Sequence, residues 1–100
     1  MTDRELLERA AKAAGYEYAK HGGYIVVDGI PGNWNPLTDD GDALRLAVKL
    51  EINILPTMEE ASARNPSYTT WINEDGRTDP YAATRRAIVR AAAEIGKGMQ

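Results

Sequence analysis

The sequence predicts an α+β domain in which three helices pack on a mostly antiparallel sheet of about five short strands, in the order αββαβββα. Three segments repeat apolar residues at helical spacing and begin at residues that cap helices well. Between them, short runs alternate apolar and polar residues and are bounded by Gly, Pro or Asn. The chain has 100 residues, which is the size of one domain with one core, so we expect a single domain over 1–100.

The first helix is predicted to begin after Thr2 and to end at Gly15. Thr2 and Glu5 have the spacing of a capping box, and Gly15 suits the left-handed position that follows a helix. Its apolar side consists of Leu6, Leu7, Ala10 and Ala14. The segment "YEYAKHGGYIVVDG" (16–29) then predicts a hairpin that turns at His21, Gly22 and Gly23. The prolines, glycine and asparagines of "IPGNWNP" (30–36) predict a loop.

Three aspartates stand at the start of the second predicted helix, at positions 39, 40 and 42. Thr38 or Asp39 would be a good N-cap, and carboxylates in a first turn favour the positive end of the helix dipole. A calcium loop would instead need ligands at alternate positions before its glycine, and this register is missing, so we predict no metal site. Apolar residues then spread over more than half of the helix circumference, and we expect this helix to be the most buried. They are Ala43, Leu44, Leu46, Ala47, Val48 and Leu50.

Three strands and a final helix complete the prediction. The strands are "EINIL" (51–55), "TMEEASAR" (57–64) and "SYTTWIN" (67–73), of which the middle one has poor β propensity. Thr78 or Asp79 would cap the last helix, Pro80 would occupy its first position, and Gly96 and Gly98 would end it.

Composition limits both the core and the possible functions. The chain has no Phe, and 15 of its residues are Ala, so the core must depend on close approach of its elements rather than on large rings. Twelve basic against 15 acidic side chains give a net charge of −3, which argues against nucleic acid as the partner. Without Cys there are no disulfides or thiolate sites. No apolar run reaches the length of about 18 residues that a membrane span needs, and no signal peptide is evident, so we expect a cytoplasmic protein.

No catalytic or cofactor-binding constellation is found, so we predict that the protein is not an enzyme. His21 is the only imidazole, and neither Ser62 nor Ser67 lies in a nucleophile elbow. Glu59 and Glu60 are neighbours in a predicted strand, where their side chains would point to opposite faces. Phosphate-binding glycine motifs are also missing from the sequence.

Two features are candidates for binding a partner. Arg85, Arg86 and Arg90 place positive charge on the last helix, where they could meet a partner protein or simply be solvated. Trp34, followed by Asn35 in the predicted loop, could be an interaction hot spot or could fold back over the core.

Two blocks of sequence resemble a family of small proteins of tailed phages and prophages that includes the NinX proteins and has no known molecular function. They are "WNPLTDDGDALRLAVKLEINI" (34–54) and "DPYAATRRAIVRAAAEIG" (79–96), about half of the chain. The resemblance implies a phage accessory protein in the host cytoplasm, and such proteins often bind a host protein, for instance a component of a defence system.

Other functions stay open at this point. A pocket between sheet and helices, or at a homodimer seam, could sequester a nucleotide-like signal. The element order from residue 39 onward is also similar to that of double-stranded-RNA-binding domains. However, the last helix begins "DPYAA" (79–83), where those domains carry a lysine cluster, so RNA binding is disfavoured.

Overall fold

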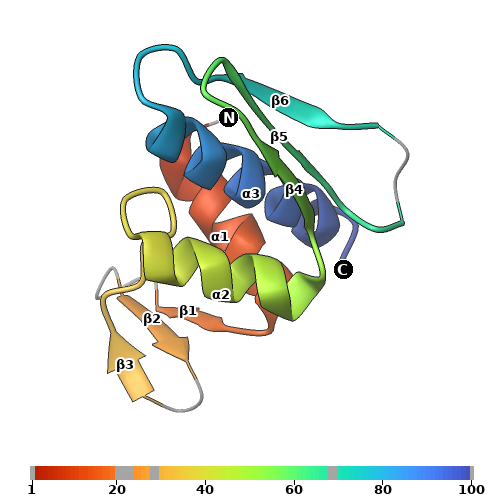
Figure 1. Ribbon diagram of the computed structural model, residues 1–100. Coiled ribbons are helices and arrows are strands. Elements are labelled where there is room, and N and C mark those ends of the chain that lie inside the picture. The colour runs from red at the N-terminus through yellow and green to blue at the C-terminus, as the bar shows by residue number, and fades with distance from the viewer. Residues whose placement is uncertain (1, 20–23, 28–29, 68–69, 100) are drawn as a thin grey trace.

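The computed structural model describes residues 2–19, 24–27, 30–67 and 70–99 (Figure 1). It confirms the α+β class and the three helices. The elements follow one another as α1 (Asp3–Ala14), β1 (Glu17–Ala19), β2 (Tyr24–Val27), β3 (Ile30–Gly32), α2 (Asp40–Leu50), β4 (Asn53–Pro56), β5 (Glu60–Arg64), β6 (Ile72–Asp75) and α3 (Pro80–Lys97).

Helix α3 is the centre of the molecule. It lies between α1 on one side and the sheet of β4, β5 and β6 on the other, and α2 packs alongside it (Figure 1). Its buried residues are mostly small: Ala83, Ala87, Ile88, Val89, Ala91, Ala92, Ala93 and Gly96. The prediction that the second helix is the most buried is therefore wrong, because α3 has neighbours on several sides whereas part of the apolar arc of α2 is exposed.

The crossing of α1 and α3 is unusually close at Gly96. A Cβ atom built on Gly96 would lie 1.9 Å from the carbonyl oxygen of Arg9 and 2.7 Å from its carbonyl carbon. Gly96 was expected to end the helix, but it lies inside α3, and Gly98 is the residue that follows the helix. The expectation of a core built on close approach is met here, since a glycine lets two backbones come into contact.

The strands form two separate three-stranded antiparallel sheets, with the orders β1-β2-β3 and β4-β5-β6. The predicted single sheet of five strands is not confirmed. Pro31 lies in edge strand β3 and Pro56 in edge strand β4. Proline has no N–H. Each of these edge strands therefore lacks a hydrogen-bond donor for a further strand at its proline. The segment Ile30–Gly32 was predicted to be loop, but it pairs with β2, which an edge position permits in spite of its proline.

The second sheet covers α3 with its smallest side chains. Central strand β5 has weak β propensity, but Ala61 and Ala63 are fully buried against the helix, where larger residues would hold the sheet away. Strand β6 begins at Ile72, later than predicted, and Thr70 precedes it. Tyr68 lies outside the described residues.

The predicted hairpin near the N-terminus has its two strands. β1 and β2 pair antiparallel, with Ala19 opposite Tyr24. The predicted turn at 21–23 lies outside the described residues, so the register of the flanking strands is what supports the hairpin.

The three predicted N-caps are confirmed. The Thr2 hydroxyl accepts a hydrogen bond from the Glu5 amide at 3.2 Å. Asp39 caps α2 by accepting from the Asp42 amide at 2.8 Å. Asp79 accepts from the amides of residues 81 and 82, and Pro80 takes the first helical position as expected. Each cap provides an acceptor for amides that have no partner inside the helix.

Glu51, the residue that follows helix α2, was predicted to begin a strand. Glu51 is left-handed, with φ 55° and ψ 38°, and the Ile52 amide donates to the Ala47 carbonyl at 2.9 Å. A left-handed residue followed by a hydrogen bond back to the last helical turn commonly ends a helix, and the left-handed position is usually occupied by glycine. The position is thus occupied by a residue whose Cβ disfavours it.

We expect Glu51→Gly to raise the free energy of unfolding by about 0.5–1 kcal/mol, because glycine adopts the left-handed conformation without steric cost. Urea unfolding followed by circular dichroism measures the change. Glu51→Ala is the matched control, since it removes the carboxylate but keeps the Cβ. An equal gain in both variants would contradict the conformational explanation.

Candidate functional site

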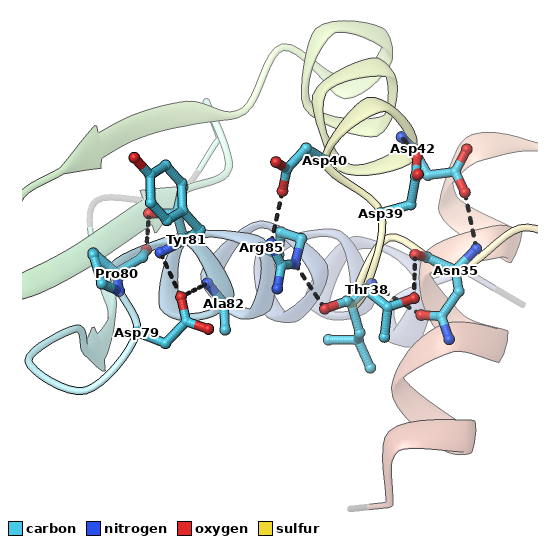
Figure 2. Close-up of polar contacts among 12 residues, drawn as sticks. Asn35, Thr38, Asp39, Asp40, Asp42, Asp79, Pro80, Tyr81, Ala82 and Arg85 are labelled. Atoms are coloured by element: carbon cyan, nitrogen blue, oxygen red, sulfur yellow. Dashed lines mark hydrogen bonds and ion pairs between the residues drawn. The ribbon is translucent and has the colours of Figure 1, made fainter.

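The predicted binding residues Trp34 and Asn35 are both engaged in the fold. Trp34 is half-buried against the core, and its ring meets the Tyr16 ring edge to face, with centroids 5.6 Å apart and an interplanar angle of 81°. Asn35 binds the turn that leads into α2. Its side-chain oxygen accepts a hydrogen bond from the Leu37 backbone amide at 3.0 Å. Its backbone amide donates to the Asp42 carboxylate at 3.0 Å (Figure 2). These contacts anchor the loop to the start of α2.

The predicted basic residues of α3 are each paired with a carboxylate from another element. Their partners are Asp40 of α2 at 2.7 Å for Arg85, Asp3 of α1 at 3.0 Å for Arg86, and Glu74 of β6 for Arg90. The three arginines therefore join α3 to three neighbours. The positive stripe expected from the sequence is balanced by these acids.

Arg85 is the most buried of these arginines, and it ties α2 to α3. Its side chain is only 18% exposed. Its Nε donates to the Leu37 carbonyl at 2.8 Å, and its second contact is the ion pair with Asp40 (Figure 2). Because one guanidinium holds both the turn before α2 and the first residue of α2, it fixes the position of that helix end on α3.

The aspartates at the start of α2 serve the architecture, since each makes a different contact. Asp39 caps the helix, Asp40 pairs with Arg85, and Asp42 accepts from Asn35 and from Arg45, the latter at 2.8 Å. Within the described part of the chain, no three acidic or imidazole side chains are grouped as metal ligands would be.

A cavity of about 520 Å³ with both polar and apolar lining residues lies between α1, β6 and α3. It is lined by Leu6, Asn65, Thr70, Ile72, Glu74, Arg86, Arg90, Ala91 and Glu94. Two of the predicted arginines thus share one cavity, although both are already bound to carboxylates. A ligand that binds here would have to compete with those ion pairs or bind to the other residues of the lining.

A second hollow, which we name the α2–β4 groove, has a volume of about 420 Å³ and is mainly apolar. It is lined by Asp40, Ala43, Leu44, Ile54, Pro56, Tyr81, Thr84, Arg85 and Ile88. Among the described residues that line it, the charged ones are Asp40 and Arg85, which neutralise each other. Tyr81 and Arg85 project from the same side of α3, and Arg85 reaches Asp40 at the start of α2 (Figure 2).

Two exposed large side chains, Leu44 and Tyr81, line this groove, and an exposed apolar residue of α2, Val48, lies outside the lining. Leu44 is 60% exposed, Tyr81 is 70% exposed, and Val48, one turn beyond Leu44 on α2, is 69% exposed. Sequence reasoning assigned Leu44 and Val48 to the core. The signal that could have identified them is the width of the apolar arc of α2, which exceeds what one neighbouring surface covers.

The angular position of each apolar residue around α2 decides whether it reaches the core. At 100° per residue, Ala43, Leu46 and Ala47 share one side, and all three are buried. Leu44 and Val48 project from the flank of that side. The polar flank opposite carries Lys49, whose ammonium lies 4.6 Å from the centre of the Tyr16 ring. The exposed leucine and valine therefore form an apolar strip directed away from the polar flank.

A separate electrostatic feature lies at the end of β6. The Arg77 guanidinium donates to the Asp75 carboxylate at 2.7 Å. Hydrogen bonds from the Arg77 side chain and backbone lower the pKa of Asp75 from its ordinary value of 3.8 to about 2. The charged form of Asp75 is thus favoured in the folded chain.

We expect the pKa of Asp75, followed by carbon NMR of its carboxyl group, to be about 2 in the wild type and to return towards 3.8 in Arg77→Ala. Since the folded-state pKa is lowered, the pair adds stability above the unfolded pKa and loses it as the pH falls towards 2. An unchanged pKa in the variant would show that the Arg77 side chain is not the cause.

Comparison with family models, with curated proteins and with solved structures finds no match to this chain. In the described part of the chain, none of the helices combines the length and the apolar character that crossing a membrane requires. The case for function therefore depends on the geometry of the two hollows and of the surfaces beside them.

Proposed function

We propose that this protein is a non-enzymatic protein-binding module and that it contacts its partner through the α2–β4 groove. The observation that carries the proposal is the exposure of Leu44 and Tyr81, which line an apolar hollow, together with the exposed Val48 one turn beyond Leu44 on α2. Contiguous exposed apolar surface is costly in water and is typical of interaction sites. Tyrosine at the rim adds a side chain that is enriched in binding hot spots.

The proposal moves the contact away from most of the residues that the sequence suggested. Trp34 and Asn35 hold a loop to the core and to α2, and Arg86 and Arg90 hold α3 to α1 and β6. Of that set, only Arg85 lines the groove. We assign it the role of fixing one end of the groove.

The resemblance to NinX-like phage proteins supplies the biological setting of the proposal. In that setting the partner is a protein of the host or of the phage, and the module acts as an accessory factor, for example by inhibiting a defence component. The resemblance stays a prediction.

Affinity capture from host lysate with matched variants tests the proposal. Leu44→Lys places a charge in the groove, whereas Leu55→Lys makes the same change at a residue of similar exposure, 56%, next to Ile54 but on the opposite face of β4. We expect a captured protein to be retained by the wild type and by Leu55→Lys and to be lost with Leu44→Lys. After purification, its affinity should fall at least tenfold with Leu44→Lys alone. Retention of the same proteins by all three chains would contradict the proposal.

A second candidate function is the binding of a small molecule in the cavity between α1, β6 and α3. It is favoured by the presence of two guanidinium groups, Arg86 and Arg90, in a cavity of about 520 Å³. Thermal-shift measurements against a nucleotide panel test it. A dose-dependent rise that is lost in Arg86→Gln would support ligand capture, and a flat response would leave protein binding as the better proposal.

A further inference from the structure

We infer that the cavity between α1, β6 and α3 binds a small zwitterion of the size of an apolar dipeptide. The inference rests on the second candidate function, ligand binding in this cavity, and specifies the chemistry of the ligand. It follows from three properties of the lining: a carboxylate without a counter-ion, a buried amide with an unused donor, and two guanidinium groups that keep unused N–H groups.

Glu94 is the charged residue of the lining that lacks a counter-ion. Its side chain is half-buried, and it makes no ion pair or hydrogen bond to any residue that the structure describes. Arg90 lies four residues before it on α3, a spacing at which opposite charges commonly pair, but Arg90 binds Glu74 of β6 instead. Since Arg86 is likewise neutralised by Asp3, the lining keeps one uncompensated negative charge. A ligand ammonium would supply the missing cation.

Asn65 contributes a buried hydrogen-bond donor to the same cavity. The residue is 9% exposed, and its side-chain oxygen accepts from the Ser67 amide at 2.9 Å. Its side-chain nitrogen has no partner among the described residues. This nitrogen is nevertheless accessible, because in the described part of the chain the one sealed side-chain polar atom without a partner is Nε of Arg64. Since Asn65 lines the cavity, an acceptor atom of a ligand can take up its donor.

The two arginines retain donors that their ion pairs do not use. Arg86 contacts Asp3 through Nη1. Arg90 also uses Nη1, for Glu74 and for the Asn73 carbonyl. Among the described residues, Nε and Nη2 of both arginines have no partner, and the two side chains are 38% and 41% exposed. A ligand carboxylate can therefore accept from these atoms while both ion pairs stay in place.

The charged groups follow one another along one side of α3. Arg86, Arg90 and Glu94 are spaced by four residues, so each lies about 6 Å from the next along the helix axis. A dipeptide spans about 7 Å when extended, so its carboxylate can lie near Arg90 while its ammonium lies near Glu94. Leu6 and Ile72 give the same lining apolar surface for the side chains of the ligand. The cavity volume of about 520 Å³ is typical of small-molecule sites.

A ligand with negative charge alone matches this lining less well. The phosphates of a nucleotide could bind the arginines, but they would also face the carboxylates of Glu74 and Glu94. Like charges repel strongly where little water separates them. A zwitterion avoids this repulsion because its positive end lies at the carboxylate that has no counter-ion.

Calorimetric titration of the full chain with dipeptides built from Ala, Val, Leu and Ile tests the inference. The tightest binder is then compared with its N-acetylated form, which has no ammonium, and with its C-terminal amide, which has no carboxylate. We expect the affinity of each analogue to be at least tenfold lower than that of the dipeptide. The side-chain amide signals of Asn65 in a nitrogen NMR spectrum should shift when the dipeptide binds.

Two variants and a control connect the binding to the cavity. Glu94→Gln removes the charge and keeps the shape of the side chain, and Asn65→Asp keeps the acceptor for the Ser67 amide but removes the donor. We expect each to lower the affinity for the dipeptide at least tenfold, and in Glu94→Gln the difference between the dipeptide and its acetylated form should vanish. Glu17→Gln makes the same change at an exposed residue of β1 outside the lining and should leave the affinity unchanged. Thermal unfolding followed by circular dichroism checks that the variants are folded.

Three results would overturn the inference. The first is that none of these dipeptides binds at concentrations up to about 10 mM. The second is that Glu94→Gln leaves the affinity unchanged, which would place the dipeptide outside this cavity. The third is a nucleotide that binds in the cavity more tightly than every dipeptide, which would replace the ligand class and leave the second candidate function intact. The capture experiment with the α2–β4 groove decides the protein-binding proposal independently.

Discussion

Gly96→Ala is expected to destabilise the protein by at least about 3 kcal/mol, the upper range of overpacking substitutions. The new Cβ would lie 1.9 Å from the Arg9 carbonyl oxygen, which belongs to the backbone of α1 and cannot rotate away as a flexible side chain would. Relief therefore requires α1 and α3 to separate along an interface of closely packed alanines. Urea unfolding monitored by circular dichroism measures the loss.

Gly98→Ala is the matched control for this prediction. Gly98 follows α3 with φ −80°, and the nearest atom to a Cβ there, the Ile95 carbonyl oxygen, is 3.6 Å away. We expect this variant to keep the stability of the wild type within about 0.5 kcal/mol. Since alanine is favoured over glycine inside a helix by about 1 kcal/mol, a Gly96→Ala protein that is more stable than the wild type by about this amount would show that the two helices are not in contact there.

Leu46→Ala is expected to cost about 3 kcal/mol, because it removes a fully buried side chain from the contact of α2 with the core. Leu44→Ala makes the same chemical change two residues earlier on the same helix. Leu44 is mostly exposed, so its loss should change the free energy of unfolding by no more than about 0.5 kcal/mol.

The comparison of the two leucine variants tests how α2 is rotated on the core. Thermal unfolding of both, at equal protein concentration, is sufficient. Equal destabilisation would mean that Leu44 is buried as deeply as Leu46. In that case the α2–β4 groove would have no exposed apolar wall.

Local chemistry allowed the helix boundaries to be predicted from sequence. Thr2, Asp39 and Asp79 precede helical segments and cap them through their own side chains, so the information lies within a few residues of each cap. The end of α1 at Gly15 has the same local origin, since its φ of 78° favours glycine. The end of α2 was missed because Glu51 takes a similar conformation without being glycine.

Pairing between strands was predicted less well because it depends on distant contacts. The sequence shows where Pro31 and Pro56 stand, but only the three-dimensional arrangement shows that both lie on edge strands of separate sheets. The segment of strand β5 was predicted to be a weak strand because of Glu59, Glu60 and three small residues. The contribution of its alanines is evident only when α3 is packed against them. At this strand, packing against α3 outweighs the low β propensity of the residues.

The candidate site shows the same limit. Arg85, Arg86 and Arg90 form a basic stripe in the sequence, but their carboxylate partners come from α2, α1 and β6. These ion pairs cannot be predicted from a local sequence pattern, because the partners are distant in the sequence. Leu44 is the opposite case, an apolar residue counted in the core that lies on the surface because α2 exposes one flank.

Site-specific photo-cross-linking tests the central claim, that the α2–β4 groove contacts a partner protein, most directly. A benzophenone side chain replaces Leu44 in one variant and Arg45 in another; Arg45 follows Leu44 on α2 and is exposed on the polar flank. After irradiation in host cells, the groove account predicts a discrete cross-linked partner from position 44 and none from position 45. Equal cross-linking from both positions, or from position 45 only, would contradict it.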